Sequence, residues 1–208
     1  MESLLIELNK NERKPVFSLG VGNQLELLCL FDTGADIPVF TLGSEMLMFY
    51  FPNAEEIAGL CVVLNGFGRE CEVVPVYKIP NFKIVGYNGA VIEYTSLYVA
   101  CTMRKDIGAQ LVMSATMFNQ MNYTILNIGV DSPRLEIEYN DRLYCTGIKR
   151  IVGNEKEIEE FRKKYGGVPV NVVYSFTQSD TSTILDPVSQ MEAEMKQALA
   201  EVDKKFEC

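Results

Sequence analysis

One aspartate stands where an apolar segment meets a turn, and its carboxylate is the first candidate for chemistry. In 27-LLCLFDTGADIPVF-40, Asp32 follows an apolar run and precedes Thr33 and Gly34. Gly34 permits a tight turn whose backbone amides can approach the carboxylate, and Thr33 adds a hydroxyl. An ordinary turn, in which an aspartate bonds its own backbone, uses the same residue types. The apolar residues on both sides favour a turn enclosed by the core.

The sequence contains no histidine, which excludes several classes of enzyme in their usual forms. Ser-His-Asp and Cys-His hydrolases use an imidazole as general base, and many zinc sites use it as a ligand. Any catalysis must therefore rely on carboxylates or on Lys, Tyr, Ser or Cys side chains. The six cysteines form no C-x-x-C pair, so we expect reduced, mostly buried thiols and no disulfide or zinc framework.

The overall charge argues against polyanionic partners. The 208 residues include 19 basic and 28 acidic side chains, a formal charge of −9 at pH 7. Such a chain is repelled by phosphate backbones and anionic lipid, so we expect neither nucleic-acid nor membrane binding. The N-terminus lacks the apolar core of a signal peptide, and no apolar run is long enough to span a bilayer. We therefore expect a cytoplasmic globular protein.

Most of the first 150 residues predict short strands. Runs rich in Val, Ile, Leu, Tyr and Phe are separated by Gly, Asn and Pro, which is typical of a β-rich fold. The expected strands are 15–22, 25–31, 57–64, 71–79, 91–101, 123–129 and 134–140. Two segments favour short helices instead: 42–52, with Ser44 as its N-cap, and 113–122, with about two turns.

The sequence changes character after about residue 150. Asn154 and Glu157 have the spacing of a capping box at the start of a helix, and the pair Gly166-Gly167 predicts its end. The later expected elements are a strand at 168–176, a polar linker at 177–183 and an amphipathic helix that begins with Asp186 as its cap and Pro187 at its first position and carries an apolar stripe as far as Phe206. This stripe packs either on its own subunit or on a second copy of the chain.

The D-T-G-A segment after an apolar strand resembles the retropepsin-like aspartic proteases. Two further segments match that family in order. The first, 65-NGFGRE-70, lies between two expected strands and is similar to the glycine-rich flap hairpin. The second, 111-LVMSATMF-118, is similar to an apolar signature before a short helix. The chain departs from the family at Ser114, where glycine is usual, and in a flap without consecutive glycines.

The resemblance covers about residues 15–140 and implies an all-β fold, the retropepsin-like β-barrel of a half-enzyme that works as a homodimer. Aspartic proteolysis needs two carboxylates that share one proton, and one chain supplies one such motif. The nearest second copy, 180-DTS-182, lacks the apolar strand and the glycine. A two-fold dimer would instead supply Asp32 twice. The prediction is a protease domain at 1–150 with an α/β C-terminal extension at 151–208.

The activity implied by the resemblance is that of an endopeptidase, in which the Asp32 pair activates a water that hydrolyses a peptide bond. No metal or organic cofactor is expected. Asp32, Thr33 and Gly34 would form the catalytic turn, and a peptide or protein substrate would lie extended beneath the flap. The substrate-binding residues that follow are Ala35, Asp36, Ile37, Gly66, Phe67, Gly68 and Ser114.

Two other functions stay open from the sequence. The first is a catalytically inactive module with the same fold that binds peptides or supports assembly. Ser114 and the altered flap favour this function. The second is an unrelated β-rich structural protein, in which Asp32 is only a turn residue.

Overall fold

The fold is built mainly from β-strands, so the predicted all-β class is confirmed. The part of the chain that the computed structural model describes belongs to one compact unit. Within it, no helix combines the length and the apolar character needed to cross a membrane. The expected C-terminal helix lies outside the described residues, which are 2–21, 25–66, 69–119, 121–139 and 143–178.

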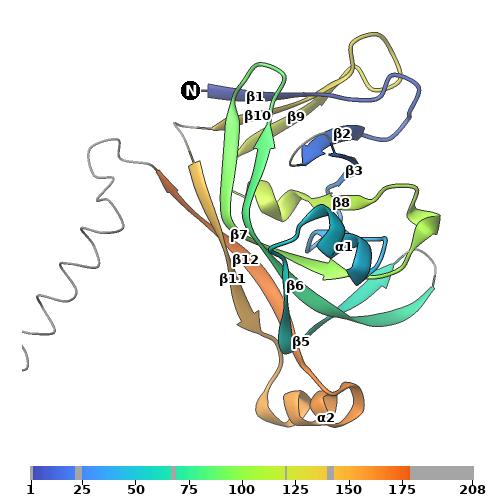
Figure 1. Cartoon of the computed structure of the whole chain (residues 1–208), viewed down its shortest axis with the longest axis vertical. Coiled ribbons are helices and arrows are strands. Elements are labelled where there is room, and N and C mark those ends of the chain that lie inside the picture. The colour runs from blue at the N-terminus through green and yellow to red at the C-terminus, as the bar shows by residue number, and fades with distance from the viewer. Residues whose placement is uncertain (1, 22–24, 67–68, 120, 140–142, 179–208) are drawn as a thin grey trace, which may run out of the picture. The chain divides into compact units, whose positions relative to one another are not determined.

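The elements follow one another as shown in Figure 1. The strands are β1 (Glu2–Glu7), β2 (Val16–Val21), β3 (Leu25–Asp32), β4 (Val39–Phe40), β5 (Glu55–Gly66), β6 (Arg69–Val85), β7 (Val91–Cys101), β8 (Leu111–Ser114), β9 (Asn122–Leu126), β10 (Arg134–Tyr139), β11 (Leu143–Ile151) and β12 (Val168–Gln178). The helices are α1 (Ser44–Tyr50), α2 (Glu155–Tyr165) and two 3₁₀ turns, η1 (Lys105–Ile107) and η2 (Ala115–Phe118).

Strands β5, β6, β7, β11 and β12 form a closed barrel (Figure 1). Their order is β11-β12-β5-β6-β7, and β11 closes the ring by pairing in parallel with β7. β5 and β6 form a long antiparallel hairpin. Tyr94 of β7 and Tyr174 of β12 pack edge to face inside, with ring centroids 5.8 Å apart. Large buried rings of this kind stabilise the barrel by the area that they remove from water.

A second group of strands extends from β7 and ends with the Asp32 turn. β4, β8, β3 and β2 follow β7 in the sheet, and β8 lies between β3 and β4. β8 is parallel to β3 and antiparallel to β4, and all its residues are buried. Phe31, next to Asp32, packs against Phe118 and Tyr123 with ring centroids 5.7 and 5.1 Å apart. The buried end of β3 therefore fixes where the turn begins.

A separate three-stranded sheet has the order β1-β10-β9. In β10, Leu135, Ile137 and Tyr139 are buried while the residues between them are partly exposed, which is the period-two pattern of a half-buried strand. In the N-terminal segment, Leu4 and Ile6 of β1 point into the same core. The sequence did not indicate β1, because three consecutive apolar residues obscure this alternation.

The predictions for the first two helices need correction. α1 begins at Ser44, but its N-cap is Gly43, which has a φ of 84° and makes no side-chain capping bond. The two-turn helix expected at 113–122 is replaced by the end of β8 and the short η2 turn. The reason is local: the Ser114 hydroxyl accepts a hydrogen bond of 3.1 Å from the Thr116 N–H and caps a 3₁₀ turn directly after the strand.

The predicted helix after residue 150 is confirmed together with its caps. The Asn154 side chain accepts from the Glu157 N–H at 3.1 Å, and the Glu157 carboxylate accepts from the Asn154 N–H at 2.9 Å. Gly166 ends α2 in the left-handed conformation. This helix lies between β11 and β12, and the predicted domain boundary at residue 150 falls within β11. Both strands belong to the barrel, so the described part of the extension continues the same sheet.

Candidate active site

The Asp32 turn holds its carboxylate by a backbone hydrogen bond. Asp32 is the last residue of β3, opposite Ser114 of β8. The Gly34 N–H donates to Asp32 Oδ1 at 2.9 Å, and the Ala35 N–H donates to the Asp32 carbonyl at 3.3 Å. Asp32 is half-buried, whereas Thr33 and Gly34 are exposed at the tip. The carboxylate is therefore oriented by its own turn, and its second oxygen, Oδ2, takes no part in that hydrogen bond.

Gly34 contributes its amide but no unusual backbone angle. Its φ does not lie in the left-handed region, and a Cβ at this position would be 3.4 Å from Asp32 Oδ1, an ordinary contact. The expectation that the turn requires the freedom of glycine is therefore not met within one subunit. The exposed position leaves another reason for a small residue, namely close approach by a ligand or a second copy.

The hydroxyl groups of Ser114 and Thr116 bind the backbone of the Asp32 turn. Ser114 is fully buried, and its hydroxyl donates to the carbonyl of Ala35. The Thr116 hydroxyl donates to the Asp36 carbonyl at 3.1 Å and lies 2.7 Å from the Ser114 hydroxyl. Ser114 was expected to line a side-chain pocket, but its burial beneath the turn makes it a residue that positions Asp32 and its neighbours.

A cavity of about 450 Å³ opens beside Asp32. The turn residues Gly34–Ile37 form one wall, and Val62–Asn65 of the β5 arm form a second. A third wall consists of Val152 and Pro169–Asn171, from the ends of β11 and β12 that flank α2. The volume lies in the range of small-molecule and peptide side-chain sites.

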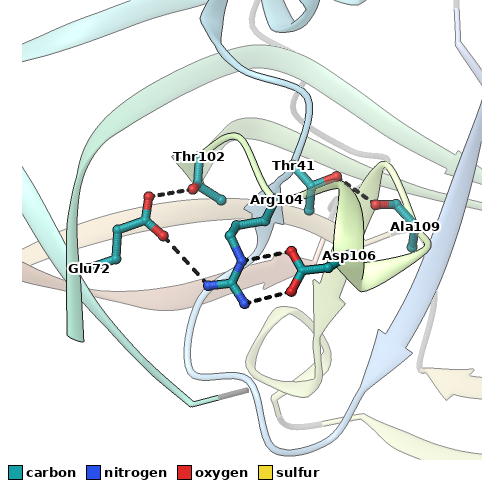
Figure 2. A network of polar contacts seen from close by, with 6 residues as sticks. All are labelled: Thr41, Glu72, Thr102, Arg104, Asp106 and Ala109. Carbon is teal, nitrogen blue, oxygen red and sulfur yellow. Dashed lines mark hydrogen bonds and ion pairs between the residues drawn. The ribbon is translucent and has the colours of Figure 1, made fainter. Parts of the chain in front are cut away.

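A polar network joins the β5–β6 hairpin to the floor of this cavity (Figure 2). Arg104 donates to both oxygens of Asp106 at 2.9 and 3.1 Å, and its guanidinium lies 3.7 Å from Glu72 of β6. The Thr102 hydroxyl donates to the other Glu72 oxygen at 2.6 Å. The hydrogen bond with Asp106 raises the pKa of Arg104 above its ordinary value. The one cation that lines the cavity in the described chain is thus already matched by two carboxylates.

The structure brings together some of the predicted site residues. Asp32, Gly34, Ala35, Asp36 and Ile37 line the cavity. Gly66 ends β5, next to the lining residue Asn65, while Phe67 and Gly68 lie outside the described residues.

Sequence reasoning missed Thr102, Arg104 and the β11–β12 wall. The pattern Arg104-x-Asp106 directly after a buried strand was an available signal, since a charged pair at such a position often bounds a site. The β11–β12 wall had no comparable signal, because it contains no charged residue and no recognisable motif.

The remaining reactive side chains lie elsewhere. Cys29, Cys61, Cys101 and Cys145 are buried, and Cys71 is exposed. Burial raises the pKa of Cys101 to about 11 and that of Cys145 to about 12, so both are protonated thiols at neutral pH. Among the described residues no group of His, Cys, Asp or Glu could hold a metal ion. The side chain best placed for chemistry at the cavity is therefore the Asp32 carboxylate.

Comparison with protein-family models, with curated proteins and with solved structures gave no match. Fold and site together define an all-β protein whose closed barrel and neighbouring strands carry an aspartate at the wall of a cavity.

Proposed function

We propose that the protein is an aspartic endopeptidase that acts as a homodimer, with one Asp32 from each subunit. The observation that carries this proposal is the position of Asp32: its carboxylate is fixed by the Gly34 amide at the wall of a cavity that the β5–β6 hairpin borders. The retropepsin-like order of segments in the sequence agrees with it. The exposure of Thr33 and Gly34 at the tip of the turn leaves this surface available to a second copy.

The two carboxylates of the dimer divide the work of hydrolysis. Two like charges a few Å apart cannot both ionise easily, so the pair holds one proton. The ionised Asp32 takes a proton from a water molecule while the oxygen of that water attacks the carbon of the peptide carbonyl. The protonated Asp32 donates its proton to the carbonyl oxygen. The proton gained from water then passes to the amide nitrogen, and one hydroxyl of the gem-diol returns its proton to the other Asp32 as the C–N bond breaks. A carboxylic acid and an amine leave, and the pair again holds one proton. Neither product requires a further reactant.

The residues around the turn would hold the substrate and the catalytic groups. Ser114 and Thr116 fix the Ala35 and Asp36 carbonyls, which keeps the turn rigid. The β5–β6 hairpin, in which Gly66 pairs with Arg69, would add an extended peptide as a further strand. Near this end of the hairpin, Glu72 is joined to Thr102 and Arg104, so these contacts hold the hairpin beside the cavity.

The first test is the pair Asp32→Asn and Glu26→Gln, assayed on a peptide library at pH 4 to 7. The side-chain amide oxygen in Asp32→Asn can still accept from the Gly34 N–H, so the fold is expected to persist. Cleavage is expected to fall by about 10²- to 10⁴-fold, the usual contribution of a general acid–base group. Glu26 is exposed on β3, the same strand as Asp32, and is not one of the described residues that line the cavity, so Glu26→Gln serves as the matched control and retains cleavage. Equal activity of Asp32→Asn and the natural protein contradicts the proposal.

The second test asks whether two subunits share the site. Mixing natural and Asp32→Asn subunits in equal amounts under exchange conditions leaves about one quarter of the activity if each site needs two Asp32 residues, and about one half if each chain acts alone. A natural protein that binds peptides but cuts none would instead be the inactive peptide-binding module.

A further inference from the structure

The end of the barrel hairpin that carries α2 reaches the Asp32 cavity. β11 ends at Ile151 and β12 begins at Val168, and α2 lies between them. Val152 and Pro169–Asn171 lie where the chain leaves and re-enters the hairpin, and they line the same cavity as Asp32. A segment of the chain more than one hundred residues after the Asp32 turn thus forms a wall of the site.

Several contacts hold this wall in place. The Val152 N–H donates to the Pro169 carbonyl at 3.0 Å, which joins the two ends of the hairpin. β12 pairs with β5 at Val168–Leu60 and Pro169–Cys61, and the Cys61 thiol contacts the Val168 carbonyl at 3.7 Å. The wall is therefore attached directly to the β5 arm, which forms the neighbouring wall of the cavity.

Val152, Pro169 and Val170 give this wall apolar side chains next to the polar Asn171, and Ile37 and Val112 add apolar side chains to the lining of the same cavity. Val152 is 49 % exposed at the rim, whereas Val170, Ile37 and Val112 are almost fully buried. Arg104 offers little to an acidic ligand, because Asp106 and Glu72 already bind its guanidinium. The exposed Val152 side chain offers apolar area at this rim, and a large aliphatic or aromatic side chain that covers it gains buried apolar area.

We infer that Val152, Pro169 and Val170 form a specificity-determining wall of the peptide-binding site and select a large apolar side chain close to the bond that Asp32 cleaves. This inference rests on the proposed function for its cleavage readout, but peptide binding tests it separately. The C-terminal hairpin then both closes the barrel and determines which peptides enter the site.

The experiment compares Val152→Glu with Ile151→Glu. Ile151 is 62 % exposed, precedes Val152 directly and is not one of the described residues that line the cavity, so it is a matched control. Each protein digests a peptide library, and mass spectrometry reads the residues around every cleaved bond. We expect Val152→Glu to lose preference for large apolar residues at one position by about 10-fold or more, since a charge then faces that side chain. Ile151→Glu keeps the natural profile.

A second arm removes the dependence on cleavage. Phage-displayed random peptides are selected on Asp32→Asn protein, with and without Val152→Glu or Ile151→Glu. Enrichment of large apolar residues that only Val152→Glu abolishes supports the inference, even if the natural protein cuts nothing and the protease proposal fails. If the natural protein is active and Val152→Glu has the same cleavage profile, the inference is overturned and the protease proposal stands. If the natural protein cuts no peptide, two results overturn both proposals: no peptide is enriched, or the same peptides are enriched on all variants.

Discussion

Ser114 illustrates how one buried hydroxyl can set the geometry of the candidate site. It occupies the last position of β8, opposite Asp32, where the resembled family usually has glycine. Its hydroxyl donates to the Ala35 carbonyl and accepts from the Thr116 N–H, so it joins the turn to η2. A glycine here would need another group to satisfy these backbone atoms. In this chain the hydroxyl makes Ser114 part of the support for the turn.

Ser114→Ala should therefore lower the free energy of unfolding by about 1–3 kcal/mol, the cost of leaving buried polar groups without a partner. Urea unfolding followed by fluorescence or circular dichroism measures this change. Ser18→Ala is the control, because Ser18 is exposed on β2. Equal loss of stability in both variants would show that the hydroxyl at position 114 has no special role.

At the scale of single residues, the sequence indicated one local contact, that between the Gly34 amide and the Asp32 carboxylate, which are two residues apart. It did not indicate the Ser114–Thr116 cap of η2, although these groups are equally close in the chain, because the segment also fits a longer helix. The contact between Glu72 and Arg104 joins two strands far apart in the chain, so no local pattern encodes it. The long-range half of the site could therefore not be predicted.

At the scale of elements, the junction between β12 and β5 depends on a close backbone approach. Gly167 precedes β12, and a Cβ at this position would lie 2.8 Å from the Cys61 sulfur and 3.3 Å from the Gly59 carbonyl oxygen. The sequence indicated this glycine only as the end of a helix. Its second role, close packing against β5, becomes visible only once the two strands are adjacent.

Gly167→Ala should destabilise the protein by about 1–3 kcal/mol, because the added methyl group forces the hairpin away from β5. Gly20→Ala is the control, since a Cβ on this exposed strand residue meets nothing within 4 Å. Thermal unfolding of both variants measures the difference. Two variants with the same midpoint would contradict the close packing of β12 on β5.

The sequence predicted strands well where apolar runs are bounded by turn residues, as in β7, whose expected and observed limits agree. It did not indicate β11, because Gly147, Lys149 and Arg150 interrupt the apolar pattern. It also missed β8 as a strand, since four buried residues fit a helix equally well. Short or irregular strands take their conformation from their neighbours in the sheet.

At the scale of the whole molecule, the buried thiols and phenols lower the free energy of unfolding when the pH becomes alkaline. Burial raises the pKa of Cys101, Cys145, Tyr94 and Tyr174 in the folded protein. In the unfolded chain a thiol ionises near pH 8.5 and a phenol near pH 10, to a rough approximation. The folded state then binds more protons than the unfolded state above these values. The contribution of the two thiols to the free energy of unfolding is complete below about pH 8.5. It decreases as the pH rises toward their folded pKa values of about 11 and 12.

The free energy of unfolding in urea, with a reducing agent present, should accordingly be lower at pH 10.5 than at pH 8. Each thiol that ionises only in the unfolded chain contributes a slope of about 1.4 kcal/mol per pH unit. Cys145→Ala reduces the total slope, whereas Cys71→Ser leaves it unchanged because Cys71 is exposed. A flat profile between the two pH values would contradict the burial of these groups.

The closure of the barrel could not be predicted from the sequence. β11 pairs in parallel with β7, and β12 pairs in parallel with β5, so each junction joins segments that are distant in the chain. Local periodicity reports which face of a strand is apolar, but it does not report which strand lies beside it. The apparent change of character near residue 150 reflects the charged helix α2 rather than a new sheet.

The order of the barrel strands has a consequence for synthesis on the ribosome. Among the barrel strands, β5, β6 and β7 emerge before β11 and β12, which pair with the outer strands of that three-stranded unit. Until then the nascent chain presents two open edges that can recruit other chains. Productive folding must therefore wait for translation to pass β12, and slow refolding with a strong dependence on protein concentration is the expected result in a test tube.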